Sequence, residues 1–442
     1  MLEHEDIQHI LLTRVPAQTG RYEFVTFRDP AGARAWLAAL IPTVQSAAEV
    51  ASPLNEDDRW VTVAFTWNGL RALGLDEASL DSFPDEFKQG MVARAEILGD
   101  VGPNHPDNWV DGLASADLHA IVILFARDDA ARERCEARYA ELGVSAAGVE
   151  RLSSLLLNAT PPFNYAHDHF GYRDRLSQPV IEGSGTEPMP GSGAPLKAGE
   201  FILGYPDEDG AVADAPRPEV LARNGSYMAY RRLREHVGAF RDFLRDNADT
   251  PEEQELIAAK LMGRWRSGAP LVLAPDRDDP ELGADPKRSN DFDYGTMDPY
   301  GYAAPVGSHV RRMNPRDTVA RMNRRRMIRR GATYGPALPE TAPDDGQDRG
   351  IAAFIICASL VRQFEFAQNV WVNDKNFKDL RNERDPIIGT QDGTLDFKIP
   401  KRPVRKIIER LPAFTNVVGG AYFFLPGLRA LRFLAGLQGG DS

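Results

Sequence analysis

Residues 307–316 read Gly-Ser-His-Val-Arg-Arg-Met-Asn-Pro-Arg and open the stretch that decides how this chain is interpreted. Residues 317–323 continue Asp-Thr-Val-Ala-Arg-Met-Asn, and residues 324–335 read Arg-Arg-Arg-Met-Ile-Arg-Arg-Gly-Ala-Thr-Tyr-Gly. Asn314-Pro315 stops a helix, because proline lacks a backbone donor and restricts the residue before it. The run 317–330 is then predicted to be a short helix, whose last turn carries arginines and whose C-cap is Gly331.

One histidine, His309, precedes this dense set of arginines. A neutral imidazole can ligate iron, and fixed guanidinium groups can pair with haem propionates or with charge that develops on a bound peroxide. The residues alone leave two other interpretations open. His309 is then a structural histidine, and the arginines form a solvated face or an ion-pair network.

Bulk composition narrows the classes of protein. The chain has 442 residues, 43% hydrophobic and 26% charged, and no apolar run approaches the ~18 residues of a membrane span. The net charge of −12 argues against nucleic-acid binding, which depends on neutralising phosphates. The first residues show no secretion signal, and two cysteines, Cys135 and Cys357, cannot build a disulfide framework. We therefore expect a cytoplasmic protein without membrane or nucleic-acid partners, and homo-oligomer formation stays open.

Strands and helices are expected in a similar order in both halves. Two α+β units of the ferredoxin-like kind, each an antiparallel sheet with helices on one face, fit this order. We expect the junction between the two domains to fall in the glycine-rich segment 182–199, which gives domains 1–195 and 196–442. The patterns predict strands over 7–13, 60–66, 118–125 and 419–426, helices over 30–40, 130–142, 235–245, 251–262 and 428–437, a surface excursion over 264–302, and a short helix or turn over 404–409.

The arginine-rich stretch resembles the proximal-histidine and distal-arginine region of the dye-decolourising peroxidases. The resemblance covers nearly the whole chain. It includes Phe-Pro-Asp-Glu-Phe-Lys-Gln-Gly-Met from 83, Glu-Phe-Ile-Leu-Gly-Tyr from 200, Asn-Gly-Ser-Tyr-Met-Ala-Tyr from 224 and Gly-Ala-Tyr-Phe-Phe-Leu-Pro from 420. It implies two ferredoxin-like domains, with haem b in a cavity of the C-terminal domain near the domain junction.

The family's Gly-x-x-Asp-Gly motif has two candidates here. Residues 389–393, Gly-Thr-Gln-Asp-Gly, match it by letter. Residues 171–175, Gly-Tyr-Arg-Asp-Arg, match except at Arg175, but they follow His-Phe and precede Ser-Gln-Pro, as in the family. We therefore assign the distal aspartate to Asp174 rather than Asp392. Arg175 departs from the family pattern and motivates an alternative, a haem-binding or haem-handling protein with weak peroxidase turnover.

The resemblance assigns a role to each remaining site residue. His309 is the iron ligand, and Arg329 stabilises the departing oxygen of hydrogen peroxide. Asp174 shuttles the peroxide proton, and the low reference pKa of aspartate, ~3.9, predicts an acidic activity optimum. Three arginines are candidates for pairing with the propionates: Arg311, Arg312 and Arg316.

The reducing substrates are expected to be bulky aromatic or dye-like donors. Such donors are too large for a closed haem pocket, so oxidation at a surface tryptophan or tyrosine is the expected route. Trp371, Tyr334 and Tyr422 are available, although the preferred interpretation of each is a core residue. His167 and His169 flank Asp168, but no third ligand stands at a convincing spacing, so they are expected to be structural.

Overall fold

The computed structural model describes residues 1–15, 17–50, 59–142, 148–157, 167–174 and 176–436. Within these residues the main sheet has strand order β4-β1-β3-β2-β10-β5-β7-β6, and neighbouring strands are antiparallel. The strands are β1 Thr19–Phe27, β2 Arg59–Phe65, β3 Ala120–Ala126, β4 Val149–Leu157, β5 Ser226–Glu235, β6 Ile328–Tyr334, β7 Gly350–Cys357 and β10 Thr415–Leu425.

Each half of this sheet has the ferredoxin-like order. The first four strands lie in the order fourth, first, third, second, and the last four, β5, β6, β7 and β10, repeat that order. The halves join where Phe65 of β2 pairs with Phe424 of β10. β4 and β6, the two ends of the order, also contact each other, so the sheet curves round on itself. The predicted α+β class with two ferredoxin-like units is confirmed.

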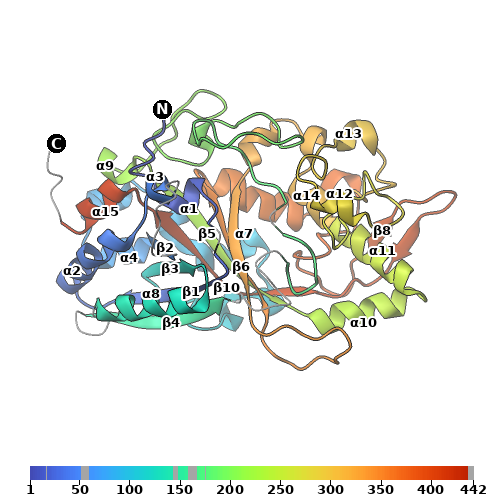
Figure 1. Cartoon of the computed structure of the whole chain (residues 1–442), viewed down its shortest axis with the longest axis horizontal. Coiled ribbons are helices and arrows are strands. Elements are labelled where there is room, and N and C mark those ends of the chain that lie inside the picture. Colours follow the sequence, from blue (N-terminus) through green and yellow to red (C-terminus); the bar gives the residue numbers. More distant parts are fainter. Residues whose placement is uncertain (16, 51–58, 143–147, 158–166, 175, 437–442) are drawn as a thin grey trace.

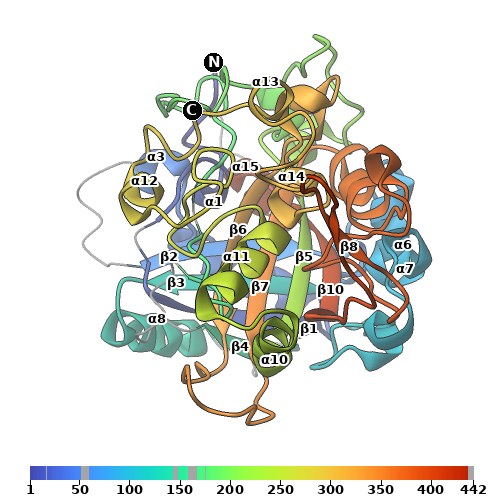
Figure 2. The same ribbon diagram turned by 90° about the vertical axis from the view of Figure 1, so that its right-hand side faces the viewer.

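Helices cover the outside of the curved sheet. In Figure 1 the helices of the first half, α2, α4 and α8, lie at one end of the molecule, and α10, α11 and α14 lie at the other. Figure 2 looks onto that second end. The helices are α1 His9–Leu12, α2 Pro30–Leu40, α3 Ala47–Val50, α4 Trp67–Ala72, α5 Glu77–Asp81, α6 Asp85–Ala93, α7 Ala95–Leu98, α8 Asp129–Glu141, α9 Glu219–Ala222, α10 Val237–Asn247, α11 Pro251–Met262, α12 Pro280–Ala284, α13 Tyr294–Met297, α14 His309–Met313 and α15 Leu428–Leu434.

The inner face of the sheet is packed with aromatic rings from both halves. The ring of Tyr22 in β1 lies 5.0 Å from that of Phe354 in β7, and Phe354 lies 5.2 Å from Tyr230 in β5. Phe24 in β1 also contacts Tyr230, at 5.5 Å. The Tyr22–Phe354 and Phe24–Tyr230 pairs cross from the first half to the second, so the two halves share one core.

The region 317–330 is not the predicted helix. It forms two short 3₁₀ turns, Arg316–Thr318 and Met322–Arg325, and then enters β6 at Ile328. Gly331 is not a C-cap but lies within the strand, paired with Ala353 of β7. A Cβ there would meet the carbonyl oxygen of Ala352 at 2.9 Å, so glycine permits the close approach. The ladder to β7 outweighs the local helix signals.

Other element predictions have mixed outcomes. The predicted strand at 7–13 is wrong: residues 9–12 form α1, and the Gln8 amide donates to the carbonyls of Val63 and Pro426 instead of a strand ladder. Residues 406–408 form a strand, β9 Lys406–Ile408, which pairs with β8 Phe397–Ile399. The buried strand at 118–125 and the helices at 30–40, 130–142 and 251–262 are confirmed. Both cysteines are buried and free.

Among the described residues, no helix combines the length and apolar character that crossing a bilayer requires.

Because Phe354 joins rings from β1 and β5, its removal should leave a cavity that rigid strands cannot close. Phe354→Ala should lower the free energy of unfolding by about 3–5 kcal/mol, as measured by urea denaturation. Phe433→Ala is the control. The Phe433 ring on α15 is 37% exposed, so its removal should lower the free energy of unfolding much less. Equal losses in both variants would contradict a shared core.

Candidate active site

One cavity of about 390 Å³ lies between the second half of the sheet, α14, and the loop that follows residue 166. Its volume falls in the ~300–1,000 Å³ range of cavities that hold small molecules and cofactors. Residues from five strands line it, and much of its wall is apolar. The apolar lining includes Leu233, Met262, Val310, Met313, Ile355, Phe364, Ile387, Ile388 and Val417.

His309 is the first residue of α14 and lines this cavity. Its Nδ1 atom lies 2.9 and 3.1 Å from the two carboxylate oxygens of Asp385. Asp385 is fully buried and also accepts the backbone N–H groups of Ile387 and Ile388, each at 2.9 Å. Burial alone would raise the pKa of Asp385, but His309 and the Ile388 amide hold it below its usual value.

This arrangement fixes the tautomer of the imidazole. Since an ionised carboxylate only accepts, Nδ1 carries the proton and donates it to Asp385. The other ring nitrogen, Nε2, is then the atom whose lone pair would be available to bind a metal ion. A carboxylate behind a ligating histidine also orients the ring and raises its basicity. Asp385 was not among the residues singled out from the sequence.

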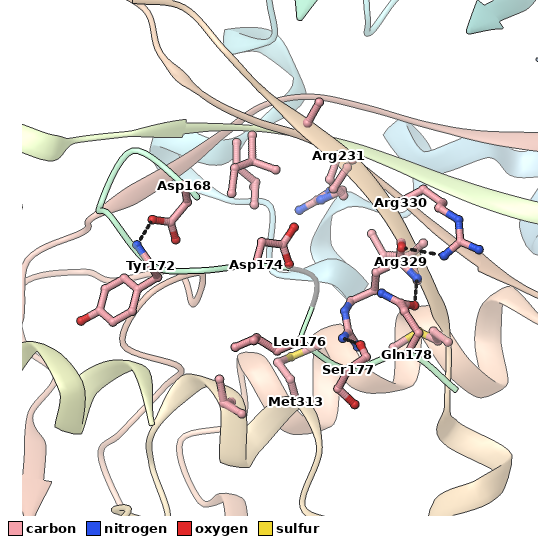
Figure 3. Close-up of a pocket in the computed structure, with 18 of the residues that line it drawn as sticks. Asp168, Tyr172, Asp174, Leu176, Ser177, Gln178, Arg231, Met313, Arg329 and Arg330 are labelled. Carbon is pink, nitrogen blue, oxygen red and sulfur yellow. Dashed lines mark hydrogen bonds between the residues drawn. The ribbon is translucent and has the colours of Figure 1, made fainter. Parts of the chain in front are cut away.

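Asp174 lies on the loop 167–174 and faces the same cavity. The loop is shaped by a turn in which Asp168 accepts the Tyr172 N–H at 2.7 Å, and the Gly171 N–H donates to the Asp168 carbonyl at 3.0 Å. Gly171 has φ +90°, a backbone conformation that residues with a Cβ rarely adopt. The turn therefore directs Asp174 toward the cavity (Figure 3). Arg175 lies outside the described residues.

Arg329 is held against the continuation of that loop. Its Nη2 donates to the Ser177 carbonyl at 2.6 Å, and its backbone N–H donates to the Gln178 side chain at 3.0 Å. Burial lowers the pKa of Arg329, and the charge of Asp174 opposes that shift. Figure 3 shows Asp174 and Arg329 on the same wall. The structure therefore brings together His309, Asp174 and Arg329, as expected from the sequence.

Arg316 lines the cavity and Arg326 lies near enough to repel it, so one edge of the cavity is electropositive. Arg316 donates to the carbonyls of Phe292 at 2.7 Å and Asn290 at 2.9 Å, and its guanidinium lies 3.7 Å from the centre of the Phe292 ring. Burial, together with repulsion from Arg329 and Arg316, lowers the pKa of Arg326 to about 10. Such a gathering of like charges favours an anionic group beside it.

Arg311 and Arg312, which the sequence offered as propionate partners, do not line the cavity and are bonded to other groups. Arg311 donates to the Asp298 carboxylate at 3.0 Å and to the Ala304 carbonyl at 2.6 Å. Arg312 donates to the carbonyls of Trp371 at 2.6 Å and Glu383 at 2.8 Å. On one short helix, His309, Val310 and Met313 face the cavity, so these two arginines point away from it.

The remaining candidates lie elsewhere. Asp392 does not line the cavity, and its carboxylate accepts from the backbone and side chain of Thr394. Trp371, Tyr334 and Tyr422 are all buried, which agrees with the core reading of each rather than with a surface oxidation site. His169 is buried with Nε2 2.8 Å from the Tyr334 carbonyl, and the described residues contain no group of three metal-ligating side chains.

Comparisons with known proteins agree with this fold and cavity. Residues 6–152 match the family described as the DyP dimeric alpha+beta barrel domain. Peroxidase 2 from Mycetinis scorodonius is 32% identical over 456 residues, covering 97% of this chain and 86% of that protein. A dye-decolorizing peroxidase from Mycena epipterygia is 30% identical, covering 98% and 87%. The crystal structure of a fungal DyP-type peroxidase from Auricularia auricula-judae is 27% identical with a TM-score of 0.87, covering 98% and 99%.

Fold, cavity and relatives together define a peroxidase built on an α+β barrel. More specifically, the chain belongs to the dye-decolourising peroxidase family.

The buried carboxylate behind His309 should matter to stability as well as to chemistry. Asp385→Ala leaves the imidazole N–H and two backbone amides without their acceptor, so unfolding should become easier by about 1–3 kcal/mol. Asp392→Ala is the control, because its side chain is 43% exposed. Urea denaturation measures both variants, and an Asp385→Ala protein as stable as the control would refute this role.

Proposed function

We propose that this chain is a haem peroxidase that reduces hydrogen peroxide and oxidises bulky aromatic or dye-like donors. The observation that carries the proposal is one cavity with two facing sets of groups. An imidazole backed by a carboxylate supplies a metal ligand, and an aspartate beside an arginine supplies acid–base and electrostatic catalysis. The alternative function, a haem-handling protein with weak turnover, is less well supported, because the similar proteins are named as peroxidases.

The residues present fit haem b. His309 Nε2 would ligate the iron. Arg316, which lines the cavity, and Arg326 beside it would pair with the propionates, because repulsion between these arginines makes an anionic partner favourable there. The apolar walls suit a porphyrin ring. Haem, when bound, supplies the iron at which the O–O bond of peroxide is broken and through which electrons pass.

The chain's own residues would do the acid–base work. Asp174 takes the proton from one oxygen of hydrogen peroxide and returns it to the other, which leaves as water. Arg329 stabilises negative charge on that departing oxygen, and its bond to the Ser177 carbonyl keeps the guanidinium fixed while charge develops.

The proposal of aromatic donors rests on the relatives. A solved dye-decolorizing peroxidase with a TM-score of 0.87 and 28% identity to this chain was crystallised with 2,6-dimethoxyphenol. A phenol of that kind carries an electron-rich ring that gives up an electron readily. We propose the same chemical class of donor here.

Replacing the proposed proton shuttle should slow peroxide reduction far more than haem binding. In haem-loaded protein, Asp174→Asn should cut the rate of the reaction with hydrogen peroxide by ~10²–10⁴-fold, measured by stopped-flow absorbance. Asp392→Asn should stay within roughly twofold of the wild type, because that side chain lies outside the cavity. The opposite pattern, with Asp392→Asn slow and Asp174→Asn fast, would overturn the assignment.

The stabilising charge is tested separately. Arg329→Gln keeps polar donors but removes the positive charge, so the rate with peroxide should fall by ~10²–10³-fold. The haem Soret band should persist, since His309 and the propionate partners are untouched. A variant that loses haem but keeps the residual rate per bound haem would instead mark Arg329 as a cofactor anchor.

A further inference from the structure

Two more carboxyl groups line the cavity and have no part in the proposed mechanism, Asp168 and Glu235. Asp168 lies on the loop that carries Asp174, and Glu235 is the last residue of β5. Figure 3 shows Asp168 on the side of Asp174 away from Arg329. The cavity is therefore lined by three acids, and of the two that Figure 3 labels, Asp174 is the one nearer to Arg329.

The contacts of this pair are those of acids without a counter-ion. Glu235 is 5% exposed, and its Oε2 accepts only the His169 N–H, at 3.2 Å. Asp168 accepts the Tyr172 N–H at 2.7 Å. Among the described residues neither carboxyl forms an ion pair. Arg266 is near enough to act on Asp168, but its guanidinium donates to Glu255 at 2.8 Å.

Two neighbouring carboxylates without a counter-ion cannot easily both be charged. Burial first, and then repulsion from Asp174, raises the pKa of Asp168 to about 7 against the opposing pull of the Tyr172 amide and Arg266. Burial and repulsion from Asp168 raise the pKa of Glu235 well above its ordinary value. Glu235 is the more buried of the two and, among the described residues, has no cation bonded to it, so we assign the retained proton to Glu235. The titratable and charged groups around the pair are His167, His169, Tyr172, Arg173, Asp174, Glu255, Arg266 and Arg349.

We propose that Asp168 and Glu235 act as one acid pair that holds a proton inside the cavity at neutral pH and passes it to Asp174. The inference rests on the proposed peroxidase function. Reducing one hydrogen peroxide to two waters takes up two electrons, which the aromatic donors supply, and two protons. In each transfer an O–H bond of the pair breaks, an O–H bond forms on the Asp174 carboxylate, and solvent returns a proton to the pair.

A purely structural role is the competing explanation, because Glu235 and Asp168 also tie the loop 167–174 in place. The Glu235→Gln variant distinguishes the proton-holding role from the structural role. The glutamine carbonyl still accepts the His169 N–H, but the side chain no longer holds an acidic proton. Glu23→Gln is a matched control, since Glu23 is buried in β1 with a pKa that burial raises, yet it lies outside the cavity.

The first readout needs no haem. Infrared difference spectra of the protein at pH 7 should show a protonated carboxyl band in the wild type that Glu235→Gln removes. Asp168→Asn keeps an acceptor for the Tyr172 N–H, and it should make the band titrate at lower pH, because the repelling charge is gone. The proposal of a proton-holding pair would be overturned if the band remained in Glu235→Gln, or if its titration pH did not change in Asp168→Asn.

The second readout is the pH profile of donor-supported turnover in haem-loaded protein. Glu235→Gln should lower turnover roughly tenfold at pH 7 and much less in acid, where solvent supplies protons; a direct acid–base group would contribute ~10²–10⁴-fold. Glu23→Gln should leave the profile unchanged. A profile shifted equally by both variants, or by neither, would overturn the proposal. If the wild-type protein did not react with hydrogen peroxide but showed the infrared band, the peroxidase function alone would be refuted.

Discussion

The site depends on one hydrogen bond, from His309 Nδ1 to the buried carboxylate of Asp385. A charged carboxylate with no exposure survives in the interior only when it is well bonded, and three N–H groups converge on it here. In return, Asp385 fixes the tautomer of His309 and aims its second nitrogen into an apolar cavity. Without that bond the imidazole would be free to rotate, and neither nitrogen would be reserved for a metal.

The opposite wall depends on a strand rather than a helix. In β6, Arg329 points into the cavity while Ile328 and Ala332 pack into the shared core. The loop that bears Asp174 is bonded to the same strand through the carbonyl of Ser177 and the side chain of Gln178. The distance between the aspartate and the arginine is therefore set by a sheet edge and a clamped loop, which is the kind of rigid support that acid–base chemistry needs.

Much of the fold could be predicted from the sequence, because alternating and apolar runs such as 118–125 carry their own strand signal. The stretch 317–330 could not, since its helix signals are local and the ladder that decides it comes from β7. Asp385 was missed because it lies 76 residues from His309, and no local pattern links the two. Arg311 and Arg312 were misjudged for a different reason: proximity to His309 in sequence says nothing of which face of α14 they occupy. Only the requirement that a ligating histidine have a carboxylate behind it could have pointed to a buried aspartate downstream.

The central claim, that this cavity holds a peroxide-reactive haem on His309, is tested most directly by the absorbance spectrum of haem-supplied protein. The account predicts a Soret band that shifts on adding one equivalent of hydrogen peroxide and returns when an aromatic donor follows. It also predicts that His309→Ala loses the histidine-ligated spectrum. An unchanged spectrum in His309→Ala, or a wild-type Soret band indifferent to peroxide, would contradict it.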